Sequence, residues 1–347
     1  MTLRMVPFGP EHLEQATELV AARYRAARAH IPFLPARFEC PEAILPRLQD
    51  HAGNVPGVAA LRGGKLVGFV LSLLVRNRQE RMGYVPDFGH AAAGEGCHEV
   101  YRRMYAILAD QWLANGCFLH AITLYPHERE AIEAWVSVGF GLIVIDALQP
   151  LEREWDAAGI PGGIELCRGG PQDVDVVSPL EIALDRHLAA SPAYLPLLVE
   201  DGRQGWERWL ADETHALWLA VRGGEAVGYL RFEPSEGLVL PTASEGTIAI
   251  TGAYTCPEVR GQGVGTALLR RGFEAYATSG ALSERYTHCS VDFESTNLLG
   301  SRFWLGSGFV PVCRSLMRRV DRRLAWAHAR RDPVDVLRAY EGQTWIG

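Results

Sequence analysis

The stretch CPEVRGQGVGTALLRR, from Cys256 to Arg271, carries three glycines at every second position, directly after an arginine and before a helix-like apolar pattern. The preceding segment 247–254 is rich in β-branched and aromatic residues, which is typical of a strand. After Gly263 the apolar residues recur at helical spacing until Gly280. The sequence therefore predicts a strand, a glycine-rich turn and a helix in succession.

This arrangement is typical of an anion-binding site. The first N–H groups of a helix have no intrahelical acceptor, and the helix dipole favours negative charge at that end. Glycines let a phosphate approach the backbone closely. We expect the backbone of Gly261-Gln262-Gly263-Val264-Gly265-Thr266 to hold such a group, with the Thr266 hydroxyl and the Arg260 guanidinium as further contacts.

Two common nucleotide-binding motifs fit this run poorly. The dinucleotide fingerprint G-x-G-x-x-G requires a third glycine where this chain has Thr266, and an acidic residue after the next strand, whereas Glu284 precedes that strand. A P-loop requires Gly-Lys-Ser/Thr, and no lysine follows the glycines. For the glycines alone, a tight turn before a helix remains the structural alternative.

The chain also contains an internal repeat. ALRGGKLVGFV at 60–70 parallels AVRGGEAVGYL at 220–230, and AWVSVGF at 134–140 parallels FWLGSGF at 303–309. Two matches in the same order predict a duplicated domain, and a stretch rich in Gly and Pro at 154–171 provides a linker. We therefore expect a first domain at 1–155, a linker at 156–171, a second domain at 172–325 and a C-terminal helix or tail at 326–347.

Each half is predicted to consist of one or two helices, a strand hairpin through Arg-Gly-Gly, then alternating helices and strands. The expected fold class is α/β of the α+β kind, in which each domain has a mixed, largely antiparallel sheet flanked by helices.

A family resemblance rests on two motifs. Arg260-x-x-Gly263-x-Gly265 at a strand-to-helix junction resembles the acyl-CoA pyrophosphate loop of the GCN5-related N-acetyltransferases (GNAT superfamily). Asn297, followed at fixed distance by the aromatic Trp304 and then Gly-Phe, is similar to the second motif of that family. The repeat extends the resemblance to a tandem, two-domain member.

The resemblance implies an N-acetyltransferase that uses acetyl-CoA as co-substrate, has no metal, and acts on an amine of an unidentified small molecule or peptide. The cofactor-binding residues that it implies are Thr255, Arg260, Gly261, Gln262, Gly263, Val264, Gly265, Thr266 and Asn297. Asn297 also suits the N-cap of a helix, and the two roles are compatible.

The first half lacks the loop motif. At the position that corresponds to the loop motif of the second half, the first half has the sequence Gly94-Glu95-Gly96. Acidic groups at this position would repel a pyrophosphate. We therefore expect a degenerate first half that does not bind CoA. Covering the second half, completing the acceptor pocket and forming a homodimer contact all remain open as its role.

The chemistry of acyl transfer has one gap in this sequence. In much of the family a tyrosine at the position of Trp304 protonates the leaving thiolate, which an indole cannot do. Tyr254 is our substitute candidate, and protonation by solvent is the alternative. Glu245 and Asp292, with Glu294, are candidates for the base. Because the usual acid is missing, a non-catalytic sensor of acyl-CoA stays open as the alternative function.

Composition narrows the class of protein. The 347 residues include 48% hydrophobic and 22% charged residues, and the net charge of -7 disfavours non-specific binding of nucleic acid. The seven cysteines are scattered and never form C-x-x-C, so neither a disulfide framework nor a zinc site is expected. No apolar run approaches the roughly 18 residues of a membrane span. We expect a cytoplasmic protein without a membrane partner.

Overall fold

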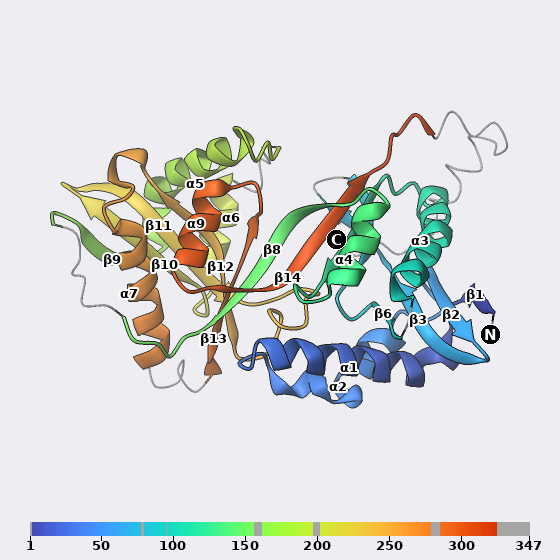
Figure 1. The fold of residues 1–347 in the computed structure, drawn as a ribbon. Coiled ribbons are helices and arrows are strands. Elements are labelled where there is room, and N and C mark those ends of the chain that lie inside the picture. The colour runs from blue at the N-terminus through green and yellow to red at the C-terminus, as the bar shows by residue number, and fades with distance from the viewer. Residues whose placement is uncertain are drawn as a thin grey trace. The chain divides into compact units, whose positions relative to one another are not determined.

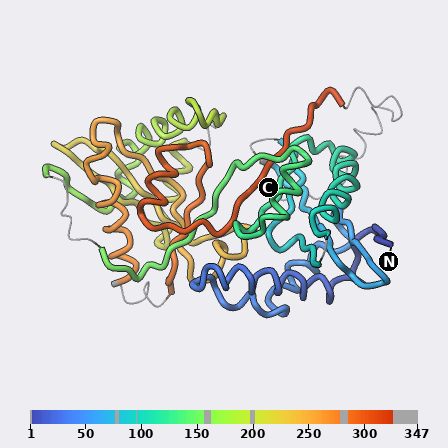
Figure 2. Tube along the Cα trace, viewed as in Figure 1, coloured from blue at the N-terminus to red at the C-terminus, as the bar shows by residue number. Residues whose placement is uncertain are grey.

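The structure, a computed structural model, describes residues 2–77, 80–94, 96–155, 162–196, 202–278 and 285–324 (Figures 1 and 2). The chain divides into two compact units. Unit 1 comprises Met1–Val144, Leu238–Pro241 and Val312–Gly347, and unit 2 comprises Ile145–Gly237 and Thr242–Pro311. The tail predicted at 326–347 and the linker residues 156–161 lie outside the described residues.

Unit 1 contains one four-stranded sheet in the order β1-β2-β3-β6 and a second run of strands in the order β4-β5-β7-β14. Its core gathers the aromatic faces of α3 and α4, including Trp112 and Trp135, against the strands. Its strands are β1 (Leu3–Pro7), β2 (Gly57–Arg62), β3 (Lys65–Leu71), β4 (Leu73–Asn77), β5 (Glu80–Val85), β6 (His90–Ala92), β7 (Leu119–Leu124) and β14 (Val310–Arg319), and its helices are α1 (Leu13–His30), α2 (Pro41–Gln49), α3 (Cys97–Ala114) and α4 (Arg129–Ser137).

Unit 2 is built on a sheet in the order β8-β13-β12-β11-β10-β9. From β9 to β12 neighbouring strands are antiparallel, whereas β12 and β13 are parallel. Its strands are β8 (Gly141–Pro150), β9 (Glu165–Gly169), β10 (Ala216–Arg222), β11 (Glu225–Pro234), β12 (Thr247–Thr255) and β13 (His288–Glu294), and its helices are α5 (Val174–Ala189), α6 (Gly202–Leu210), α7 (Val264–Thr278) and α9 (Leu298–Gly306).

Alternation along β10 divides the core of unit 2 into two layers. Leu217 and Leu219 pack with residues of α5 and α6, whereas Trp218 points to the opposite face and packs with residues of α7 and α9. The helices therefore cover both faces of the sheet. The mixed, largely antiparallel sheet flanked by helices that the sequence predicts is confirmed.

Both Arg-Gly-Gly segments form the turn of a hairpin. Gly63 and Gly64 connect β2 to β3, and Gly223 and Gly224 connect β10 to β11, with φ between +59° and +87° at all four glycines. Positive φ at both central residues is the turn geometry that suits a two-residue hairpin, and it favours glycine. The repeat therefore preserves a structural unit.

The last strand of each half belongs to the unit formed mainly by the other half. Strand β14, from the end of the second half, pairs antiparallel with β7 in unit 1, where Leu316 faces Ile122. Strand β8, from the end of the first half, enters unit 2 at Ile145 and neighbours β13. The linear boundaries at 155 and 172 do not include this exchange, because residue patterns mark a strand without naming its partner.

Among the helices that the structure describes, none combines the length and the apolar character that crossing a membrane requires.

Candidate functional site

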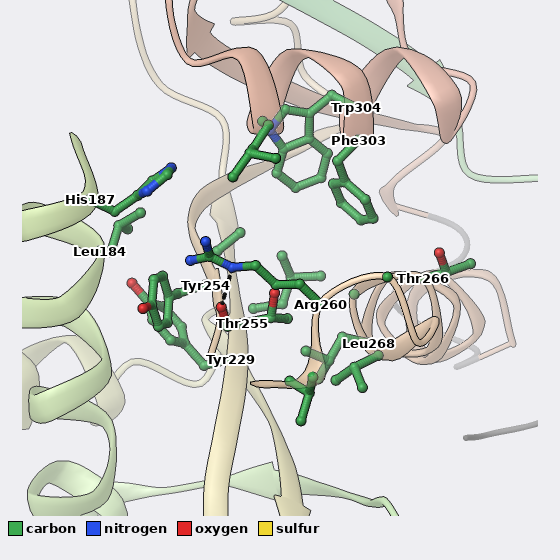
Figure 3. A pocket seen from close by; sticks show the side chains of 18 of the residues that line it. Leu184, His187, Tyr229, Tyr254, Thr255, Arg260, Thr266, Leu268, Phe303 and Trp304 are labelled. Carbon is green, nitrogen blue, oxygen red and sulfur yellow. Dashed lines mark hydrogen bonds between the residues drawn. The ribbon is translucent and has the colours of Figure 1, made fainter. Parts of the chain in front are cut away.

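A cavity of about 460 Å³ lies in unit 2, where β12 ends and the helices α7 and α9 begin (Figure 3). Strands β11 and β12 form one wall, residues of α7 and α9 form a second, and the end of α5 contributes a third. All the lining residues belong to unit 2. The site is therefore complete within one compact unit.

The cavity exists because β12 and β13 stay together for only part of their length. Their parallel ladder runs from Thr247 opposite His288 to Ile250 opposite Val291. Directly afterwards the register of β12 against β11 shifts, because Arg231 faces Gly252 while the next residue, Phe232, faces Ile250. The extra residue in β12 is a bulge, which bends the strand. Beyond it, Ala253 begins the cavity wall.

The glycine-rich loop presents backbone donors at one end of the cavity. In the part of the chain that the structure describes, the N–H groups of Gly261, Gly263, Val264, Gly265 and Thr266 have no protein acceptor. All five of these residues line the cavity. Only the N–H of Gln262 is engaged within this run, at 3.4 Å from the carbonyl of Val259. Unpaired donors beside the positive end of a helix dipole favour an anion.

Two of these glycines are required by the local geometry. Gly263 has φ of +87°, in the region that disfavours residues with a side chain. Gly265 lies in the first turn of α7, and a Cβ there would stand 3.1 Å from Cε2 of Phe303 in α9. The glycine thus allows α7 and α9 to approach each other closely at the cavity.

Arg260 lies across the cavity. Its Nε donates to the carbonyl oxygen of Thr255 at 3.0 Å, and its guanidinium carbon lies 5.3 Å from the ring centroid of Tyr254. Figure 3 shows this side chain between the end of β12 and the start of α7. A positive charge therefore lies next to the unpaired amides.

The remaining predicted binding residues have distinct positions. Asn297 lines the cavity and caps α9, because its Oδ1 accepts from the N–H of Gly300 at 3.1 Å. Thr266 is exposed on the first turn of α7. The side chain of Gln262 bonds to protein groups, accepting from Arg222 at 2.7 Å and donating to the carbonyl of Glu258 at 2.7 Å, and Gln262 does not line the cavity.

Only one of the three predicted catalytic residues lines the cavity. Tyr254 does so, and its hydroxyl has no hydrogen-bond partner among the described residues. Glu245 in the turn before β12 and Asp292 on β13 are both exposed and do not line it. Trp304 lines the cavity with its indole and packs edge-on against Phe303 and Phe309.

Two further ionisable side chains of the cavity are not among the sequence candidates. Tyr229 on β11 donates its hydroxyl hydrogen to Glu181 at 3.3 Å, and burial together with this carboxylate raises its pKa well above the ordinary value. His187, near the end of α5, is half-buried beside Leu184. The spacing of Leu180, Leu184 and His187 puts them on one helical face, but the sequence does not show that this face turns toward the cavity.

The corresponding place in unit 1 is occupied by charged protein groups. Between the first turns of α3 and α4 lies a cavity of about 320 Å³, lined among others by Glu128 and Glu130. Glu128 accepts from Nε of Arg23 at 2.6 Å and from the N–H of Tyr125 at 2.9 Å. Burial acts to raise the pKa of Glu128, but the adjoining Arg23 guanidinium outweighs it and the pKa lies well below its usual range. The carboxylate of Glu128 is thus charged and lies directly before the first turn of α4.

Comparison with known proteins agrees with this geometry. Residues 183–298 match the family model described as "Acetyltransferase (GNAT) family". This segment belongs to the GNAT family. The matched GNAT segment runs from α5 through the glycine loop to the first residue of α9. The resemblance that the two motifs indicate is confirmed here. A search of curated proteins gives no match.

Solved structures extend the likeness to both halves. A GCN5-related N-acetyltransferase from Sphaerobacter thermophilus is 16% identical with a TM-score of 0.57, over 91% of this chain and 94% of that one. A tandem GNAT protein from the clavulanic acid biosynthesis pathway, without AcCoA, is 16% identical with a TM-score of 0.51, over 91% and 98%. The chain therefore shares the fold of a tandem GNAT protein.

Proposed function

We propose that unit 2 transfers an acetyl group from acetyl-CoA to an amine of a small molecule or peptide. The observation that carries this proposal is one cavity lined both by the unpaired amides of Gly261, Gly263, Val264, Gly265 and Thr266 and by Tyr254 and Trp304. An anion site at one end and an aromatic, partly apolar end at the other suit a coenzyme with a diphosphate and a thioester arm. GNAT membership supports acyl transfer as the reaction type.

Different residues of the cavity bind the diphosphate, stabilise the carbonyl oxygen and donate a proton. The amides of Gly261, Gly263, Val264 and Gly265 bind the diphosphate, and the charge of Arg260 adds to their attraction. The end of β12 lies beyond its ladder with β13 and beside the thioester arm, where its amides stabilise the carbonyl oxygen as charge develops on it. Tyr254 donates a proton to the departing thiolate.

The proposal assigns CoA binding to unit 2 alone. In unit 1 the carboxylate of Glu128, held by Arg23, lies directly before α4 and lines the cavity between α3 and α4, where its negative charge would oppose a diphosphate. The acetyl group as the acyl donor, a cytoplasmic location and a homodimer remain parts of the same proposal. Glu245 and Asp292 are outside the cavity and would reach the reacting groups only through solvent.

The first test removes the anion site. The double variant Gly263→Val, Gly265→Val places a side chain at a positive φ and another against Phe303. Loss of two charge-assisted hydrogen bonds of about 1.5 kcal/mol or more each weakens CoA binding at least about 100-fold. Calorimetric titration with CoA measures the change.

The matched control is Gly306→Val in α9, since a Cβ at this glycine meets nothing within 4 Å. This variant should bind CoA as the unchanged protein does. Equal affinity of the double variant and the control would remove the assignment of the loop. Release of free thiol from acetyl-CoA with a panel of primary amines then distinguishes an enzyme from a protein that only binds the coenzyme.

A further inference from the structure

His187 lies opposite the helix ends that begin the anion site. It belongs to the last turn of α5 and lines the cavity together with Leu184 (Figure 3). Figure 3 shows its ring directed toward the space bounded by Tyr254 and Trp304. The ring is half-buried, and neither nitrogen has a hydrogen-bond partner in the ranges that the structure describes. Both are therefore available to a bound molecule.

The other ionisable groups of the cavity are unsuited to accept a proton from an amine. Arg260 carries a permanent positive charge and has no acceptor atom. Tyr229 already donates to Glu181, and burial raises its pKa well above the ordinary value. Tyr254 is the proton donor of the proposed reaction. Among the described residues that line this cavity, His187 is the side chain whose neutral form is a base.

We propose that His187 is the catalytic base that takes a proton from the amine of the acceptor. This inference rests on the proposed function and assigns to it a residue from α5, on the wall opposite the glycine loop. An ammonium group gives one proton to the imidazole and becomes a neutral amine. The nitrogen lone pair then forms the C–N bond to the thioester carbon.

The remaining protons and electrons also balance. When the C–S bond breaks, its electron pair leaves with sulfur, and the thiolate receives a proton from Tyr254. The amide nitrogen loses a second proton, which reprotonates Tyr254, and the imidazolium of His187 returns its proton to solvent. The net change converts thioester and ammonium to amide, thiol and one free proton.

The charged and titratable groups around His187 come from four elements. Asp185 and Arg186 are its neighbours on α5, Tyr229 and Tyr254 face the cavity from β11 and β12, and Arg260 brings a positive charge from the loop before α7. A pH profile must therefore be compared between variants that differ at position 187 alone.

The test compares two nucleophiles in the variant His187→Gln. Putrescine, glucosamine and spermidine are mainly protonated at neutral pH and need a base, whereas hydroxylamine is mainly neutral. For the amine of this set that the unchanged protein acetylates fastest, kcat falls about 100-fold or more, which is the usual contribution of a general base. The rate with hydroxylamine and the affinity for CoA both remain within about twofold.

Two readouts distinguish catalysis from a structural role. The limb of the kcat/KM profile that rises with pH is lost in His187→Gln, and added imidazole restores turnover in His187→Gly. The control Ile182→Ala changes an exposed, uncharged side chain on the same helix and leaves turnover unchanged.

The outcomes separate the inference from the proposed function. If CoA binds and amines are acetylated but His187→Gln keeps the unchanged rate and pH profile, His187 is not the base and the proposed function stands. If the unchanged protein binds no CoA, or binds it and acetylates neither the amines nor hydroxylamine, the proposed function fails and the base assignment fails with it.

Discussion

His90 in unit 1 is a histidine whose charge is decided by burial. It is fully buried, with Nδ1 2.9 Å from the hydroxyl of Tyr101 and Nε2 2.9 Å from the carbonyl of Thr123. Burial, reinforced by the nearby Arg23 charge, lowers its pKa to about 3. The ring is therefore neutral in the folded protein and is a packing and hydrogen-bonding group rather than a ligand contact.

This neutrality makes unit 1 sensitive to acid. Below the ordinary histidine pKa of 6.5, His90 is protonated in the unfolded chain but stays neutral in the folded protein until the pH approaches 3. The free energy of unfolding therefore decreases as the pH falls from 6.5 toward 3. In His90→Gln this contribution is absent. Between pH 6.5 and pH 4 the variant should lose up to about 3 kcal/mol less than the unchanged protein, as measured by urea unfolding at each pH.

The buried carboxyl of Asp87 changes the stability with pH in the opposite direction to His90, so only the difference between His90→Gln and the unchanged protein reports on His90. Burial raises the pKa of this carboxyl to about 6, so its contribution to stability decreases as pH rises from 3.8 to 6. The control is Val136→Gln, at an exposed residue of α4 in the same unit, which should leave the pH dependence unchanged. CoA affinity should be unaltered in both variants. A pH dependence that is the same in His90→Gln and the unchanged protein would contradict the assignment of His90.

Features of the site that depend on local backbone geometry could be predicted from the sequence, whereas the side chains that enter the cavity from other elements could not. The glycines of the loop and the cap residue Asn297 follow from local rules for helix starts. His187 requires knowing which helix packs against β12, which no local pattern contains. Glu245 and Asp292 do not line the cavity, because the direction of a side chain depends on how its strand pairs, which no local pattern contains.

At the scale of elements, α9 depends on Asn297 for its start. The side chain caps the helix through Gly300 and also lines the cavity, so a substitution by alanine would mix two effects. Asn297→Asp separates them. A carboxylate remains a good cap, whereas its charge opposes a bound diphosphate.

We expect Asn297→Asp to keep the stability of unit 2 within about 0.5 kcal/mol and to weaken CoA binding about tenfold or more. Asn297→Ala should lower stability by about 1 kcal/mol. Thermal unfolding and calorimetric titration measure the two effects on the same samples. Unchanged CoA affinity in the aspartate variant would restrict Asn297 to its role as a cap.

At the scale of the whole molecule, the exchange of β8 and β14 couples the two halves of the sequence. Unit 1 includes residues from Val312 onward, and Leu316 of β14 is buried in its core opposite Ile122. The hairpins were predictable because a Gly-Gly turn joins strands that are adjacent in sequence. The exchange was not, since the repeat alone suggests that each half keeps its own last strand.

This coupling predicts where a core substitution in β14 takes effect. Leu316→Ala removes a side chain that is 2% exposed, and Leu→Ala changes in a core lower stability by about 2–5 kcal/mol. Although Leu316 lies in the second half of the sequence, we expect the loss in unit 1. Hydrogen exchange of backbone amides should therefore accelerate in β5 and β7 and stay unchanged in β12 and β13.

The control for this prediction lies on the same strand. Val310 is 36% exposed, so Val310→Ala should change stability by less than about 0.5 kcal/mol. Faster exchange in β12 and β13 of the Leu316→Ala protein, with β7 protected, would mean that the last strand stays with its own half. Because β14 supplies a core residue of unit 1, the first half of the sequence produced without residues 310–319 should lack part of the core of unit 1.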